Sequence, residues 1–247
     1  MTRHPLYWSV FCCLILALSG CAEMKGGDLA GNVLSALSAS QNGGAPDEST
    51  VAAGLKEALS VGSERAVAAT SQDNGFWGNE LIRISMPQEL STMASTLRSI
   101  GFGNKVDELE LAMNRAAEKA SAEAKPVLLN AVSEMTVTDA MGILRGGDTA
   151  ATDYFKEKTS GTLREKFTPI VQEKMNQVGL YQQYNQLKST YEALPLTKKS
   201  TFDLDQYVSD QGIEGLFTML AQEEKEIRAN PAARTTDLLK KVFSQTP

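Results

Sequence analysis

The sequence has 247 residues, of which 30 are acidic and 24 are basic. The resulting net charge of −6 argues against binding to nucleic acid, which requires a basic surface. The length is sufficient for one domain with a sizeable core, and the many Ala, Leu, Glu, Lys and Gln residues favour helices over sheets.

Residues 1–20 have the features of a bacterial signal peptide. A basic start at Arg3 is followed by an apolar run over residues 7–18, which has the length of a signal h-region and is too short to cross a membrane. The run ends in Leu18-Ser19-Gly20-Cys21, which is similar to a lipobox. The sequence therefore predicts cleavage before Cys21 and lipidation of its sulfur, with acyl chains such as palmitate anchoring the protein to a membrane. The alternative is a cleaved signal peptide with an incidental cysteine.

The residue after the cysteine bears on the location of the protein. In lipoproteins of this type, an Asp at that position often indicates retention at the inner membrane, whereas here the residue is Ala22. We therefore expect a lipid-anchored protein of the cell envelope, at the outer membrane and facing the periplasm.

Cleavage would change the chemistry that is available to the mature chain. It would remove the single histidine, His4, together with Cys12 and Cys13, and lipidation would occupy Cys21. No Cys-His or Ser-His-Asp arrangement and no histidine metal site could then form. We expect no cofactor and no metal, and an enzyme would have to use carboxylates, lysine, tyrosine or a carboxylate-bound metal.

The hydrophobic periodicity predicts a flexible lipidated tether, residues 21–47, followed by an all-α, bundle-like single domain, residues 48–247. Within this domain, Gly62 interrupts the first helix without ending it, and Ser160-Gly161 separates two helices. Residues 82–86 alternate between apolar and polar side chains. We interpret them as an extended segment packed on helices, because a single strand has no partner with which to form a sheet.

Residues 135–155 predict a corner between two helices near the middle of the mature chain. Thr138 is the expected N-cap of the first helix, and Gly146-Gly147 end it by adopting a positive φ. Asp148 or Thr149 then caps the next helix. In an alternative interpretation, the free amides after Gly147 form a site for an anion.

The helix predicted over residues 105–122 carries polar residues in its apolar stripe. Glu110 and Asn114 lie near the centre of that stripe and Glu118 lies at its edge. Because buried polar groups require partners, these residues indicate either a polar edge partly in water or a lined pocket. We place a candidate binding cleft between Glu110 and Asn114 and the corner residues Arg145 and Asp148, which lie where helix ends leave free groups. The alternative is that all four residues pair within the fold.

Two acidic segments near the C-terminus need no ligand. Asp203-Leu204-Asp205 suggests a calcium loop, but Tyr207 and Val208 occupy positions where that loop needs a ligand and a glycine. Acidic residues in the first turn of a helix explain the pattern better. The run Glu223-Glu224-Lys225-Glu226 is typical of a solvated helix surface.

Four short segments together resemble a known family. They are Gly54-Leu55-Lys56-Glu57-Ala58-Leu59, Met113-Asn114-Arg115-Ala116-Ala117-Glu118, Thr152-Asp153-Tyr154-Phe155 and Phe202-Asp203-Leu204-Asp205. In order and spacing they resemble domain of unknown function family 4197 of Gram-negative bacteria, from about Val51 to Phe243. The resemblance implies an all-helical, exported domain, often with a lipobox and with no settled activity, and it offers no catalytic residues to carry over.

The function that these features favour is non-enzymatic binding or scaffolding at the envelope. The partner would be an envelope protein or an apolar ligand, besides the membrane that holds the lipid anchor. A carboxylate-dependent enzyme and a purely structural lipoprotein are the alternatives.

Overall fold

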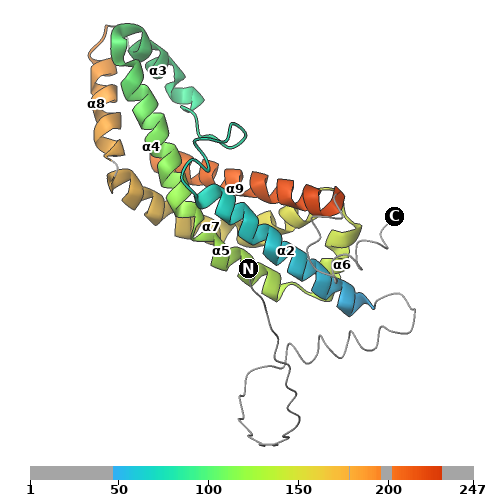
Figure 1. Ribbon diagram of the computed structural model, residues 1–247. Helices are drawn as coiled ribbons and strands as arrows, with labels where there is room; N and C mark the ends of the chain where they lie inside the picture. The colour runs from blue at the N-terminus through green and yellow to red at the C-terminus, as the bar shows by residue number, and fades with distance from the viewer. Residues whose placement is uncertain (1–46, 178, 196–201, 230–247) are drawn as a thin grey trace, which may run out of the picture. The chain divides into compact units, whose positions relative to one another are not determined.

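The computed structural model describes residues 47–177, 179–195 and 202–229, and within these ranges it contains helices and no strand. This confirms the all-α prediction (Figure 1). The elements are α2 (Glu48–Ser71), the 3-10 turn η1 (Gln88–Leu90), α3 (Ser91–Leu97), the π-helical turn η2 (Arg98–Phe102), α4 (Gly103–Ser121), α5 (Ala124–Glu134), α6 (Val137–Arg145), α7 (Ala150–Gln177), α8 (Leu180–Glu192) and α9 (Leu204–Ala229).

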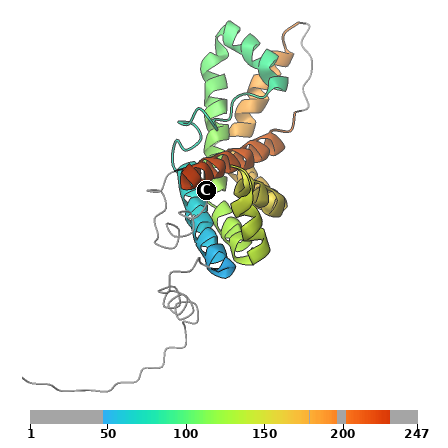
Figure 2. The same ribbon diagram turned by 90° about the vertical axis from the view of Figure 1, so that its right-hand side faces the viewer.

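The core lies where α9 packs against α7, α2 and α4 (Figures 1 and 2). Helices α5 and α6 pack against α2 and α7, whereas α3 and α8 pack against α4. The most deeply buried large side chains come from α3, α4, α5, α7, α9 and the loop after α2, and they include Phe76, Leu97, Leu109, Met113, Leu128, Phe155, Leu163, Phe167, Met175 and Phe217. Each such side chain stabilises the fold by about 1.5–3 kcal/mol relative to an exposed one.

Glycine allows one unusually close approach in this core. A Cβ atom on Gly215 of α9 would lie 2.5 Å from the Phe76 ring and 3.3 Å from Ile82. The loop before α3 can therefore pack directly on the backbone of α9 because residue 215 has no side chain.

Helix α7 continues through the position where we expected a break. Residues Ala150–Gln177 form one helix that contains both Ser160-Gly161 and Pro169. Gly161 has open space around it and no positive φ, so it costs about 1 kcal/mol relative to alanine. Burial of Phe155, Leu163 and Phe167 on both sides of it outweighs that cost.

The corner between α6 and α7 exists, but its local chemistry differs from our prediction. Thr136, not Thr138, is the N-cap of α6, in a capping box with Asp139. Neither Gly146 nor Gly147 has a positive φ. Gly146 is needed for a steric reason, because a Cβ atom there would lie 2.5 Å from the Cβ of Ala150.

Residues 82–86 behave as predicted and form no sheet. Residues 83–87 are irregular between the turn ending at Ile82 and η1, and Ile82 and Ile84 are buried. The segment therefore packs on helices.

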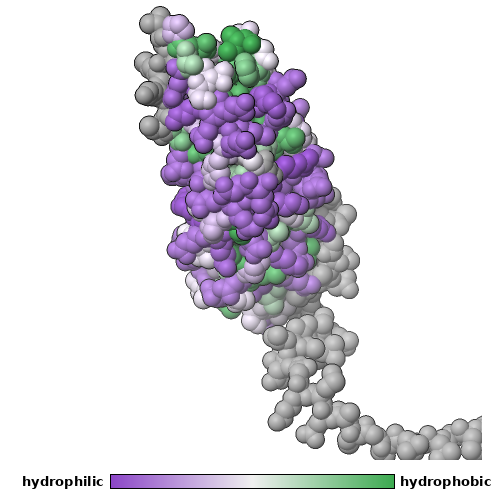
Figure 3. Space-filling model, turned by 90° about the vertical axis from the view of Figure 1, so that its left-hand side faces the viewer, coloured by the Kyte–Doolittle hydropathy of each residue, from purple (hydrophilic) through white to green (hydrophobic). Residues whose placement is uncertain are grey.

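The face shown in Figure 3 is largely hydrophilic, with apolar residues gathered toward the end formed by α3, η2 and α8. Ile100 of η2 is 44% exposed, and Gly101 beside it has a φ of 93°, which breaks the helical geometry between α3 and α4. The signal peptide, Cys21 and the tether up to residue 46 lie outside the described residues.

Candidate functional site

Helix α4 binds the irregular segment before α3 with the polar residues of its stripe. The Asn114 side chain accepts a hydrogen bond from the Ile84 amide at 2.9 Å and donates to the Ile84 carbonyl at 2.7 Å. Glu110 accepts from the Met86 amide at 2.9 Å and lies 3.6 Å from Arg98. These two side chains therefore take the place of a neighbouring strand for an extended segment that has none.

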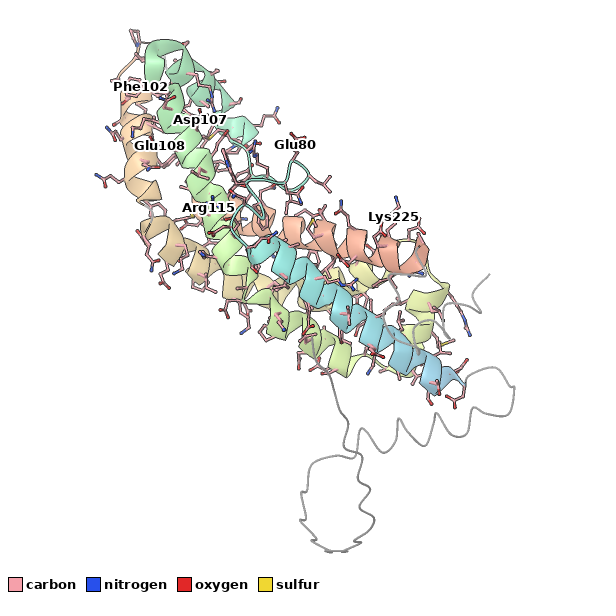
Figure 4. The ribbon with its side chains drawn as sticks, in the orientation of Figure 1. Glu80, Phe102, Asp107, Glu108, Arg115 and Lys225 are labelled. Carbon is pink, nitrogen blue, oxygen red and sulfur yellow. The ribbon has the colours of Figure 1, made fainter. Side chains whose placement is uncertain are left out.

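Glu118 extends this arrangement by one helical turn. Its carboxylate, which is 1% exposed, accepts from the amides of Phe76 and Trp77, each at 3.2 Å. Arg115 neutralises it at 2.7 Å and also donates to Asn74, whose φ of 66° is unusual for a residue other than glycine. Figure 4 shows Arg115 on α4 beside this segment. The polar residues in the apolar stripe of α4 therefore bind the backbone of the loop between α2 and α3.

The other two candidate residues lie elsewhere. Arg145 has a side chain 71% exposed and lies 3.6 Å from Glu48 at the start of α2, whereas Asp148 is exposed and has no partner among the described residues. Helix α6 and helix α3 lie at opposite ends of the described fold (Figures 1 and 2). The structure thus brings Glu110 and Asn114 together on one segment and does not bring Arg145 or Asp148 to them.

The free amides at the start of α7 bind a carboxylate of the same chain, that of Glu224. Glu224 of α9 accepts hydrogen bonds from the amides of Ala151 and Thr152 and from the Thr152 hydroxyl, each at 2.9 Å. Arg228 donates to the same carboxylate at 2.8 Å. Glu224 is 6% exposed, so the expectation that it is solvated is wrong. A carboxylate at a helix N-terminus is favoured by the free amides and the helix dipole.

The aspartates at the start of α9 also have partners within the fold. Asp203 accepts from the Gln206 amide at 3.0 Å and lies just before α9, whereas Asp205 lies in the first turn as predicted. Asp205 accepts from Gln172 at 2.9 Å and from the Tyr181 hydroxyl. Burial of the Tyr181 hydroxyl raises its pKa above the usual range, and the bond to Asp205 adds to the effect.

A groove of about 620 Å³ lies between α5, α6 and α7. Its lining comes from all three helices: Pro126, Val127, Asn130, Ala131, Glu134, Asp139, Tyr154, Lys158, Thr159, Thr162 and Lys166. This volume lies within the range of small-molecule sites. The mixture of charged groups, one aromatic ring and aliphatic surface suits a polar ligand.

Acidic groups gather at the end of the groove near Tyr154. The Tyr154 hydroxyl lies 3.3 Å from the Ala131 carbonyl, and burial raises its pKa, with further contributions from Asp139 and Glu134. Hydrogen bonds from Thr136 lower the pKa of Asp139. Asp139 therefore stays ionised at neutral pH. Lys158 lies over the Tyr154 ring at 5.9 Å and interacts electrostatically with Asp139.

Lys166 places a positive charge at a second position along the α7 wall of the groove. Lys166 is exposed and has no ion-pair partner among the residues that the structure describes. It follows Lys158 by eight residues on α7, which corresponds to about 12 Å along a helix. Both lysines line the groove.

Sequence reasoning did not identify this groove, although one signal was present. Tyr154, Lys158, Thr162 and Lys166 recur every four residues on α7, and this spacing places them on one side of the helix. The expected break at Ser160-Gly161 concealed the pattern because it assigned these residues to two helices.

Among the described helices, no single one is long and apolar enough to cross a membrane. Only α5 and α6 taken together reach the required length and composition, and the chain bends by 103° between them.

Comparison with known protein families gives one match. Residues 45–244 match a family described as "Protein of unknown function (DUF4197)". No curated protein and no solved structure matches the chain.

Proposed function

The protein belongs to the DUF4197 family, and we propose that it is a non-enzymatic binding domain that holds a small polar ligand in the groove between α5, α6 and α7. The observation that carries this proposal is the groove itself, with a volume of about 620 Å³ and charged side chains contributed by three helices. Concave sites of this size with a few polar groups are typical of ligand binding.

The chemistry of the lining supports binding in preference to catalysis. Asp139 is engaged in the capping box of α6, and burial keeps the Tyr154 hydroxyl protonated. These groups can orient a ligand by hydrogen bonds and charge, whereas neither is poised to exchange a proton near neutral pH.

We further propose that acylated Cys21 holds the domain at the envelope membrane. The sequence Leu18-Ser19-Gly20-Cys21 after an apolar run supports this part of the proposal. The segment between Cys21 and the start of α2 is long enough to let the domain stand away from the lipid surface.

Blocking the groove tests the binding proposal. Thr162 is exposed and lines the groove, so Thr162→Trp should fill the groove without disturbing the core. Glu165→Trp, on an exposed position of the same helix outside the groove, is the matched control. Native mass spectrometry of protein purified gently from its envelope should show a small-molecule adduct on the wild type and on Glu165→Trp, and none on Thr162→Trp. An adduct of equal occupancy on Thr162→Trp would place binding elsewhere.

A further inference from the structure

We propose that the groove selects a short zwitterionic ligand, such as a peptide of about three residues with free termini, whose ammonium group lies at the Tyr154 end and whose carboxylate lies at Lys166. This inference rests on the proposed binding function and names the class of ligand. It follows from how charge is distributed along the groove.

The acidic end is assembled from two helices. Glu134 at the end of α5 and Asp139 in the first turn of α6 line the groove together with Tyr154, and both act electrostatically on the Tyr154 hydroxyl. Asn130 donates to Glu134 at 2.8 Å and orients it. Lys158 supplies one positive charge here, and that charge is shared with Glu157 at 3.1 Å. Lys56 also acts electrostatically on Asp139, and Glu157 acts on Tyr154 together with Glu134 and Asp139. Three carboxylates against two lysines leave this end net negative and suited to an ammonium group.

The cationic end depends on Lys166. This side chain lines the groove and has no partner among the described residues, so it is available to a carboxylate. The neighbouring lining residue one turn earlier on the same wall is Thr162, whose hydroxyl can donate a second hydrogen bond. Pro126 and Val127 provide an aliphatic surface against which the middle of a ligand can pack.

The separation between the two ends sets the length of the ligand. Lys158 and Lys166 are about 12 Å apart along the axis of α7, and an extended peptide spans about 3.3–3.6 Å per residue. A tripeptide spans about 10–11 Å at this rise, and a charge-assisted hydrogen bond of about 2.8 Å to Lys166 lets it reach from one end to the other, whereas a single amino acid does not. A purely anionic ligand would be repelled by Glu134 and Asp139, and a purely cationic ligand would be repelled by Lys166.

Isothermal titration calorimetry with trialanine tests this inference, using the full mature chain. Trialanine with free termini should bind, whereas N-acetyl-trialanine amide, which lacks both charges, should bind at least about tenfold more weakly, because a charge-assisted hydrogen bond contributes about this factor. Lys166→Ala should weaken binding of free trialanine about tenfold and leave binding of the blocked peptide unchanged. Glu134→Gln should also weaken only the free peptide. Lys174→Ala, on the same helix outside the groove, should change neither.

The outcomes separate this inference from the function on which it rests. Equal binding of the free and blocked peptides, or failure of both to bind at millimolar concentration, would overturn the zwitterion assignment. A native-state adduct that Thr162→Trp removes would still support a binding groove in either case. Loss of that adduct in Glu165→Trp as well as in Thr162→Trp would count against the groove itself.

Discussion

Replacing Glu224 with alanine should destabilise the domain more than any other single change in the acidic run of α9. The substitution removes the acceptor from two backbone amides and one hydroxyl at the start of α7, and it removes the carboxylate of the ion pair that Arg228 makes at 2.8 Å, although the bond from Arg228 to the Ile143 carbonyl remains. A buried donor left without an acceptor costs about 1–3 kcal/mol, and breaking a buried ion pair costs about 3–5 kcal/mol. Water entering the space vacated by the side chain offsets part of this loss. We expect a net loss of about 3–5 kcal/mol.

Urea unfolding followed by circular dichroism measures this loss. With a slope of about 2–3 kcal/mol per molar urea, the midpoint should fall by about 1–2 M. Glu226→Ala is the control, because Glu226 is exposed two residues away on the same helix and its removal should change stability by less than about 0.5 kcal/mol. If both variants unfold at the same urea concentration, Glu224 does not hold the start of α7 and this account of the corner is wrong.

Three further predictions concern the core, the loop and the anchor. Gly215→Ala forces a Cβ atom against Phe76 and should lower the free energy of unfolding by about 1–3 kcal/mol. Gly161→Ala places its methyl group in open space on α7 and should raise the free energy of unfolding by about 0.5–1 kcal/mol. The melting temperatures of the two variants should therefore move in opposite directions. Asn114→Ala removes both bonds to the backbone of residue 84 and should speed amide hydrogen exchange there before the core exchanges. Unchanged exchange would show that Asn114 does not hold this segment on α4. Cys21→Ser should move the protein from the membrane to the soluble fraction, and retention after a salt wash would contradict lipid anchoring.

The helical class and most helix positions could be predicted because apolar periodicity and glycine signals are local. The stripe containing Glu110 and Asn114 was correctly identified as needing partners, since polar groups among apolar ones require them. The identity of the partner, the backbone of residues 84–86, depends on a contact between segments far apart in the sequence. No local pattern encodes that contact.

The acidic run of α9 shows a second limit of sequence reasoning. Three acidic residues and a lysine in succession are usually solvated, and the exposed Lys225 and Glu226 follow that rule. Glu224 departs from it because the amides of α7, more than seventy positions earlier in the chain, need an acceptor. Burial of a carboxylate can be predicted only when its distant donors are known.

The cleft predicted from four polar residues failed for a related reason. Helix ends and polar stripes each signal unsatisfied groups, but their pairing depends on how α4, α6 and α7 are placed. In the fold, Arg145 forms an ion pair with Glu48, and Asn114 forms a hydrogen bond with the loop before α3. The groove forms instead between α5, α6 and α7, where a continuous α7 presents a row of polar residues.

An NMR titration of the isotopically labelled mature protein with trialanine tests the central claim of a binding groove most directly. The account predicts that amide shifts change progressively and saturate, and that they are concentrated in residues 126–134 of α5, around Asp139 of α6 and in residues 154–166 of α7. Saturable shift changes confined to other elements, such as α3, α4 and α8, would contradict the claim and place recognition on a different surface.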